Sequence, residues 1–143
     1  MEYIVIDSSV AIKWFVVEHN SDKAREILDI YKDGVINFIA PDLINAEFGN
    51  ILWKKYQRNY LNIKEAEEII EAFQSISFTI ISNAKLLKDA YNLATRYNRT
   101  VYDMLYVALS ERDKCKFVTA DERLVNALGS NFQNIVWLAH WSW

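Results

Sequence analysis

Four acidic residues have the types and positions that metal-assisted chemistry requires: Asp7, Glu47, Asp103 and Asp121. Asp7 directly follows the apolar run 3–6, and Asp121 follows a second short run, 116–119. Short apolar runs rich in β-branched residues predict strands buried on both faces of a parallel sheet, and open α/β sheets bind ligands at the carboxyl ends of their strands. We therefore expect the four acidic side chains to meet in one pocket at that edge.

Four ionised carboxylates in one pocket require cations. Two carboxylates 4 Å apart repel by about 4 kcal/mol at an effective dielectric near 20. Carboxylate oxygens without a His or Cys cluster suit Mg²⁺ or Mn²⁺, whereas His19, His140 and Cys115 are scattered and argue against zinc. Two such ions roughly 4 Å apart can activate a water and stabilise the leaving oxygen of an in-line attack on a phosphodiester.

Three of the four acidic residues also have ordinary structural interpretations. Asp7 could cap the helix that follows it, although Ser8 or Ser9 could do so instead. Asp103 could be the acidic partner in a capping box with a threonine three residues earlier, and Asp121 could be a helix N-cap. For Asp103 and Asp121 taken alone, the structural interpretation is as good as the functional one. Asp7 is harder to explain structurally, because an Asp that ends a buried strand must be hydrogen-bonded, ion-paired or metal-bound to offset its desolvation.

Glu47 is the hardest of the four to explain structurally. It lies four residues after Leu43 and four before Ile51, on the apolar side of a predicted helix. An inward Glu in the middle of a helix satisfies no helix terminus and is costly to bury without a partner.

The chain alternates predicted strands and helices. Strands are predicted at 3–6, 37–40, 77–81, 116–119 and 134–138, and helices at 10–17, 21–32, 41–58, 62–74, 84–97, 102–112 and 121–128, with Pro41 in the first turn of its helix. Strands separated by helices predict an α/β protein with a parallel sheet covered on both faces and right-handed crossovers.

The composition sets outer limits on the class of protein. The chain has 143 residues, three Gly and one Pro, so we expect one domain without long linkers. A single Cys excludes an internal disulfide, and the absence of a long apolar run or leader predicts a cytoplasmic protein with no membrane contact. The formal net charge of −3 argues against strong overall attraction to nucleic acid, but an acidic pocket for cations contributes to that sum.

Four motifs, in this order, carry a resemblance to a known family. They are Val5-Ile6-Asp7-Ser8-Ser9-Val10, Pro41-Asp42-Leu43-x-x-Ala46-Glu47, Tyr102-Asp103-x-x-Tyr106-x-Ala108-Leu109 and Val118-Thr119-Ala120-Asp121 followed by Leu124. With these motifs the chain resembles a PIN-domain ribonuclease of the VapC toxin type. The resemblance covers nearly the whole chain and implies a single PIN domain over 1–143, an α/β/α sandwich around a central parallel sheet of about five strands.

The resemblance also implies a function and roles for individual residues. It implies a metal-dependent endoribonuclease that acts on RNA, a small cognate antitoxin and a homodimer. Asp7, Asp103 and Asp121 would ligate Mg²⁺ or Mn²⁺, and Glu47 would bind a second ion or orient a water. Ser8, Ser9 and Thr119 would assist as hydroxyl ligands or hydrogen-bond donors.

Contacts to RNA and to partners are less well defined. Lys13, Lys54 and Arg99 can contact phosphates, but for each the alternative is a solvated helix face. The predicted helices between residues 41 and 74 form a hairpin whose groove can receive an amphipathic antitoxin segment.

Two other classes of protein compete with the nuclease: a silent PIN-like binding protein, and a phosphoryl-handling protein such as a receiver domain or a phosphatase. A catalytically silent PIN-like protein that only binds RNA or a partner has the same motifs. A receiver domain also places acidic residues at strand ends, but it needs a Lys at the end of its last strand, and 134–138 has none. Phosphatases with an aspartate nucleophile need a second Asp two residues after the first, where this chain has Ser9.

Overall fold

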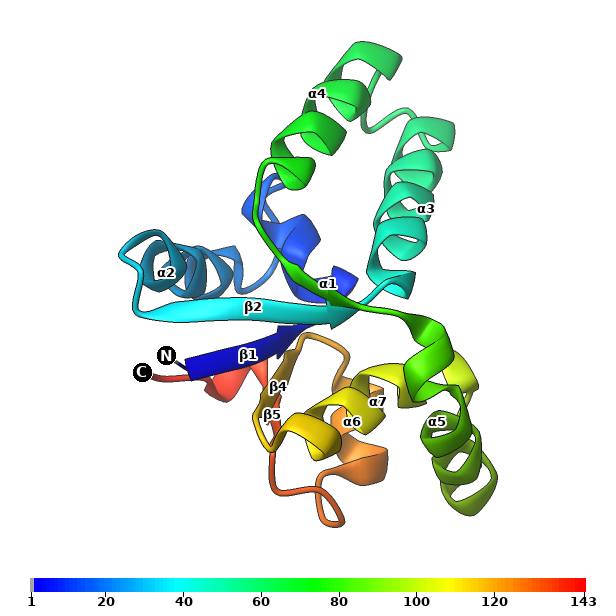
Figure 1. The fold of residues 1–143 in the computed structure, drawn as a ribbon. Helices are drawn as coiled ribbons and strands as arrows, with labels where there is room; N and C mark the ends of the chain where they lie inside the picture. The colour runs from blue at the N-terminus through cyan, green and yellow to red at the C-terminus, as the bar shows by residue number, and fades with distance from the viewer. Residues whose placement is uncertain (1) are drawn as a thin grey trace.

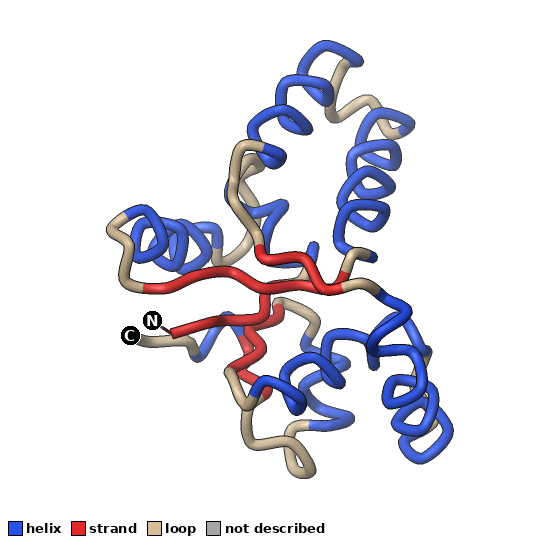
Figure 2. The backbone as a smooth tube through the Cα atoms, viewed as in Figure 1, coloured by secondary structure: helices blue, strands red, loops and turns tan. Residues whose placement is uncertain are grey.

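A five-stranded parallel sheet lies at the centre of the computed structural model, which describes residues 2–143 (Figures 1 and 2). The strands are β1 (Glu2–Ile6), β2 (Ile36–Pro41), β3 (Thr79–Ile81), β4 (Lys116–Thr119) and β5 (Ile135–Trp137), in the order β3-β2-β1-β4-β5. Every neighbouring pair is parallel. The predicted α/β class with about five parallel strands is confirmed.

Helices cover the sheet in two groups. They are α1 (Ser8–Ala11), the 3₁₀ helix η1 (Ile12–Trp14), α2 (Ser21–Lys32), α3 (Leu43–Gln57), α4 (Ile63–Gln74), α5 (Asn83–Tyr97), α6 (Val101–Asp113), α7 (Glu122–Leu128) and the 3₁₀ helix η2 (Leu138–His140). The chain runs from β1 through β2 to β3 in one direction across the sheet and then returns to β4 and β5, so right-handed crossovers place the helices on opposite faces. Figure 1 shows α1 to α4 on one side and α5 to α7 on the other, which is an α/β/α sandwich. No helix among residues 2–143 is both long enough and apolar enough to span a membrane.

The core beneath α1 and α3 is largely aromatic. Trp14 stacks on Phe38 of β2 with ring centroids 5.1 Å apart, and its indole N–H donates to the carbonyl oxygen of Ala24 at 2.8 Å. Phe48 of α3 stacks on Phe73 of α4 at 4.0 Å. Phe48 also meets the edge of Phe15, the residue after η1, at 5.9 Å. The contacts of Phe48 hold α3 against α4 and the segment after η1, and so position the helix that carries Glu47.

Three predicted starts were wrong by two residues. The strand predicted at 77–81 begins at Thr79. Pro41 ends β2 instead of opening α3, because it is in register with Ile81 of β3 and the next N–H, of Asp42, still donates to the carbonyl oxygen of Ile81 at 3.0 Å. The predicted helix 10–17 begins at Ser8 and changes to 3₁₀ geometry at Ile12. Its N-cap is Asp7, and neither serine caps it.

Candidate active site

Asp7 lies at the carboxyl end of β1, beside the end of β4. It is 8% exposed. One carboxylate oxygen accepts hydrogen bonds from the Ser9 hydroxyl at 2.5 Å and the Val10 N–H at 3.3 Å, and the other accepts from the Thr119 hydroxyl at 2.5 Å. Asp7 therefore caps α1, and it also occupies the point in the sheet where the chain order reverses and α/β proteins bind ligands.

The surroundings of Asp7 disfavour its charge. Burial raises the pKa of Asp7 to about 6, the hydrogen bonds from Ser9 and Thr119 oppose this rise, and the charge of Glu47 adds to it. An Asp normally ionises with a pKa near 3.8. Ionising this carboxyl group in the folded protein therefore costs free energy unless a cation binds beside it.

Glu47 points from α3 toward α6. The hydroxyl of Tyr106 donates to its Oε1 at 2.5 Å, and the hydroxyl of Ser8 donates to the same atom at 3.4 Å. Burial raises the pKa of Glu47, these two hydrogen bonds lower it, and the charge of Asp103 raises it further. The predicted inward orientation is confirmed, because the Glu47 residue is only partly exposed.

Tyr106 is a buried tyrosine whose hydroxyl lies among the acidic residues. Its ring is almost fully buried and stacks on Phe117 of β4, with centroids 5.6 Å apart. Burial and then the charges of Glu47, Asp7 and Asp103 raise the pKa of the Tyr106 hydroxyl. Tyr106 entered the sequence-based prediction only as part of the third motif and was given no role of its own. Its position three residues after Asp103, on the same helix face, was the available signal.

Asp103 is paired with a cation from its own chain. The N–H of Asp103 donates to the Thr100 hydroxyl at 3.1 Å, so Thr100 caps α6. The carboxylate of Asp103 accepts a hydrogen bond from Nη2 of Arg99 at 3.3 Å. Arg99, which was predicted to contact RNA, therefore pairs with a member of the acidic quartet, and its contact with RNA stays a prediction.

Asp121 caps α7, and Thr119 connects it to the other acidic residues. Its carboxylate accepts from the Leu124 N–H at 3.2 Å, and its own N–H donates to the Thr119 hydroxyl at 3.1 Å. Thr119 in turn donates to Asp7, and the Ser9 hydroxyl accepts from the Ala120 N–H at 3.0 Å. The predicted N-cap is confirmed, and Ser9 and Thr119 tie the ends of β1 and β4 together.

The donor chemistry of this site fits a hard divalent cation. The charge of Glu47 acts on Asp7, the charge of Asp103 acts on Glu47, and all three residues offer carboxylate oxygens. In their present rotamers, no three His, Cys, Asp or Glu side chains within residues 2–143 converge closely enough to hold one ion. The carboxylates face hydroxyls, backbone amides and Arg99 instead, so the ligand roles stay predictions.

The lysines predicted to contact RNA differ in their surroundings. Lys13 pairs with Glu18 at 3.5 Å, and Lys55 pairs with the same carboxylate at 2.8 Å. Burial acts to raise the pKa of Glu18, but Lys55 and Lys13 outweigh it and lower the pKa. Lys54 is exposed on α3. The RNA contacts of Lys13 and Lys54 stay predictions.

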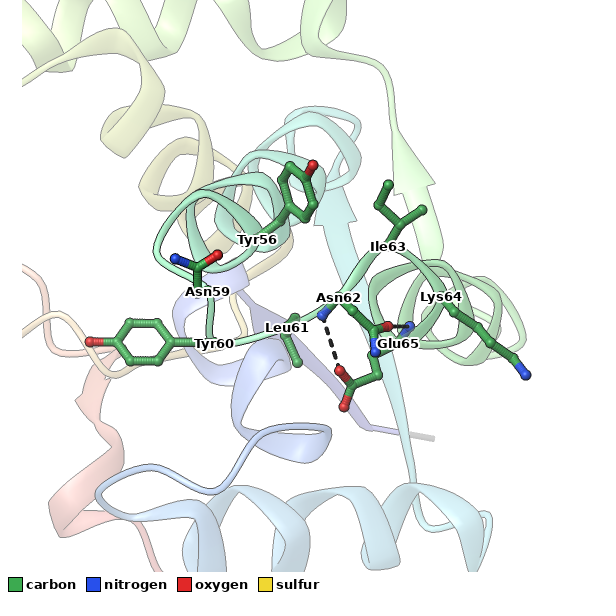
Figure 3. Close-up of a pocket in the computed structure, with 8 residues that line it drawn as sticks. All are labelled: Tyr56, Asn59, Tyr60, Leu61, Asn62, Ile63, Lys64 and Glu65. Atoms are coloured by element: carbon green, nitrogen blue, oxygen red, sulfur yellow. Dashed lines mark hydrogen bonds between the residues drawn. The ribbon is translucent and has the colours of Figure 1, made fainter.

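Two of the hollows along α3 differ in their distance from the acidic residues. One, of about 250 Å³, adjoins the site and is lined by Leu43, Ala46, Glu47, Asn50 and Tyr102. The other, of about 580 Å³, lies at the turn between α3 and α4 (Figure 3). There Asn62 and Glu65 form the predicted capping box, with hydrogen bonds of 2.8 and 3.0 Å. The larger hollow contains none of the four acidic residues, whereas Glu47 lines the smaller one, which therefore adjoins the candidate site.

A parallel sheet with acidic residues near the point where its chain order reverses is typical of α/β proteins that bind ligands at that edge. The model of the PIN domain family matches residues 4–128. Ribonuclease VapC3 of Pyrobaculum aerophilum is 34% identical over 125 residues, which cover 85% of this chain and 91% of the relative. The solved structure of PAE2754 from Pyrobaculum aerophilum superposes with a TM-score of 0.71 at 20% identity, covering 97% of this chain and 90% of that one.

A second solved structure, a toxin–antitoxin complex from Klebsiella pneumoniae, gives a TM-score of 0.64 at 12% identity and covers 93% of this chain and 95% of the matched chain. The chain belongs to the PIN-domain family, and within it to the VapC type. The resemblance stated from the four motifs is confirmed.

Proposed function

We propose that this protein is a metal-dependent endoribonuclease, the toxin of a toxin–antitoxin pair, which hydrolyses RNA phosphodiester bonds. The observation that carries the proposal is the placement of three carboxylates at the carboxyl edge of the sheet: Asp7 follows β1, Glu47 of α3 accepts hydrogen bonds from Ser8 and Tyr106, and Asp103 lies one turn before Tyr106 on α6. The family relatives named as ribonucleases support the reaction class.

Each residue of the site has a task in this proposal. Asp7, Glu47, Asp103 and Asp121 hold Mg²⁺ or Mn²⁺, which when bound lowers the pKa of water and stabilises charge on the phosphate. Ser9 and Thr119 fix the rotamer of Asp7 through both of its oxygens. Tyr106 and Ser8 both donate to Oε1 of Glu47 and so fix its rotamer through one oxygen, which keeps the charge in place as the substrate arrives.

The proposal includes protein partners and a location. We propose a homodimer in the cytoplasm that is inhibited by a small antitoxin. An apolar groove of about 200 Å³ between α3 and α4 supports an amphipathic antitoxin segment as occupant. It is lined by Gly49, Leu52, Trp53, Tyr56, Ile63, Ala66, Glu67 and Ile70.

The direct test is cleavage of total RNA and of tRNA by the purified protein with Mg²⁺ or Mn²⁺. We expect cutting that EDTA abolishes and that Asp103→Asn reduces by about 10²-fold or more, because one ligand charge is lost. Cutting that survives EDTA would contradict metal dependence. No cutting of any RNA by a protein that binds Mn²⁺ would favour the silent partner-binding alternative.

Tyr106→Phe tests whether the tyrosine positions Glu47. Removing the hydroxyl leaves Glu47 with the longer Ser8 contact alone, so we expect cleavage to fall about tenfold and the free energy of unfolding to fall by about 1 kcal/mol. Cleavage rates and urea unfolding measure the two effects. Tyr91→Phe, on the exposed side of α5, is the matched control and should change neither. Equal rates for the Tyr106→Phe variant and the wild type would show that Glu47 needs no positioning.

A further inference from the structure

Arg99 is held in place by the junction of two helices. It follows Asn98, which ends α5 in the left-handed conformation with φ 53°, and precedes Thr100, the N-cap of α6. Its own N–H donates to the carbonyl oxygen of Ala94 at 3.2 Å. The backbone of Arg99 is therefore fixed, and its side chain reaches Asp103 from outside α6.

The contact between Arg99 and Asp103 is weak for an ion pair. Only Nη2 reaches the carboxylate, at 3.3 Å, and the two side chains are 27% and 30% exposed. A single, partly exposed contact contributes little, whereas a bidentate pair is stronger. The Nε atom of Arg99 is buried and has no hydrogen-bond partner, which is costly for a donor on a charged group. Moving the guanidinium away costs little in pairing and returns Nε to water.

The same carboxylate is a predicted cation ligand. A divalent cation and the guanidinium compete for the Asp103 oxygens, and two positive charges at one carboxylate repel each other. The neighbouring acidic side chains are held by uncharged donors, so Arg99 is the one cation among residues 2–143 that pairs directly with a member of the acidic quartet.

We propose that Arg99 is an internal competitor of the metal: it occupies Asp103 in the metal-free protein and leaves it when a divalent cation binds. This inference rests on the proposed function, because it takes Asp103 as a metal ligand. Arg99 then sets the cation concentration at which the site fills.

Calorimetric titration of the metal-free full-length protein with Mn²⁺ tests the inference. Arg99→Gln keeps a polar side chain and removes the charge, and we expect it to tighten Mn²⁺ binding by about 3- to 10-fold. Arg96→Gln makes the same charge change in the exposed last turn of α5 and should alter the affinity less than twofold. Circular dichroism establishes that both variants are folded.

A second measurement follows Arg99 itself. The ¹⁵N resonance of its Nε–H group, assigned by its absence from the spectrum of Arg99→Gln, should shift when Mg²⁺ is added to the wild-type protein. Titration of Asp103→Asn with Mn²⁺ tests separately whether Asp103 is a metal ligand. If Asp103→Asn weakens Mn²⁺ binding but Arg99→Gln leaves it unchanged or weakens it, the competitor inference is overturned and the metal site stands. If Asp103→Asn binds Mn²⁺ as the wild type does, or the wild type binds none, the proposed function is overturned as well.

Discussion

Replacing Asp7 with Asn is expected to raise the free energy of unfolding at pH 7 by about 2 kcal/mol and to lower RNA cleavage by about 10³-fold. Burial raises the pKa of Asp7 to about 6, against an ordinary value of 3.8, so the folded protein pays to ionise it at pH 7. Two pKa units correspond to about 3 kcal/mol, and Asn removes the charge while keeping an oxygen for Val10 and Ser9.

The same carboxyl gives stability an unusual pH dependence. Because its folded-state pKa is raised, the folded protein binds the proton more tightly than the unfolded chain between about pH 3.8 and 6. The contribution of Asp7 to stability is therefore greatest below this window and is lost as the pH rises through it. The raised pKa of Glu47 acts in the same direction, and the lowered pKa of Glu18 acts in the opposite one.

Urea unfolding of the wild type and Asp7→Asn at pH 5 and pH 7 measures both effects. The difference between the two proteins isolates Asp7 from the other carboxyls, and the stabilising effect of Asn should be smaller at pH 5 than at pH 7. Asp89→Asn, on the exposed surface of α5, is the control and should show no such difference. An Asp7→Asn variant that is less stable than the wild type at pH 7 would show that the carboxylate is needed for the fold.

Phe48→Ala is expected to lower the free energy of unfolding by about 3–5 kcal/mol. Phe48 is 1% exposed, stacks on Phe73 at 4.0 Å and meets the edge of Phe15 at 5.9 Å. Its loss leaves a cavity between α3, α4 and the segment after η1. Phe48 is also the residue that directly follows Glu47 in the sequence. We therefore expect cleavage to fall together with stability.

Trp53→Ala is the matched control for this prediction. Trp53 is on the same helix but is 52% exposed, so its removal should cost less than about 1 kcal/mol. Guanidinium unfolding curves with equal slopes give the comparison. Similar losses for Phe48→Ala and Trp53→Ala would contradict the assigned packing of α3.

The local sequence pattern predicted an element correctly where that pattern fits only one kind of structure. The strand 116–119 was located correctly, because a buried parallel strand is a short apolar run whichever helix covers it. The start of α3 was misplaced because proline suits both a strand end and a first helical turn, and only the pairing of Pro41 with Ile81 decides between them. The single-domain organisation of residues 1–143 stays a prediction.

The members of the candidate site could be named from the sequence, but their contacts could not. An acidic residue after a strand and an inward Glu in a helix are local patterns, which is why Asp7 and Glu47 stood out. The hydrogen bond between Tyr106 and Glu47 joins residues 59 positions apart and depends on how α3 and α6 pack. The pairing of Lys13 with Glu18 depends likewise on the path of the chain after η1.

The most direct test of the central claim is anomalous scattering from Mn²⁺ in crystals of the wild-type protein, at an ion concentration that supports RNA cleavage. We predict an anomalous peak at the carboxyl edge of β1 and β4, with carboxylate oxygens of Asp7 and at least one of Asp103 and Asp121 within about 2.0–2.4 Å. An empty edge, or Mn²⁺ bound only elsewhere on the molecule, would contradict the assignment of these residues as the metal-binding centre.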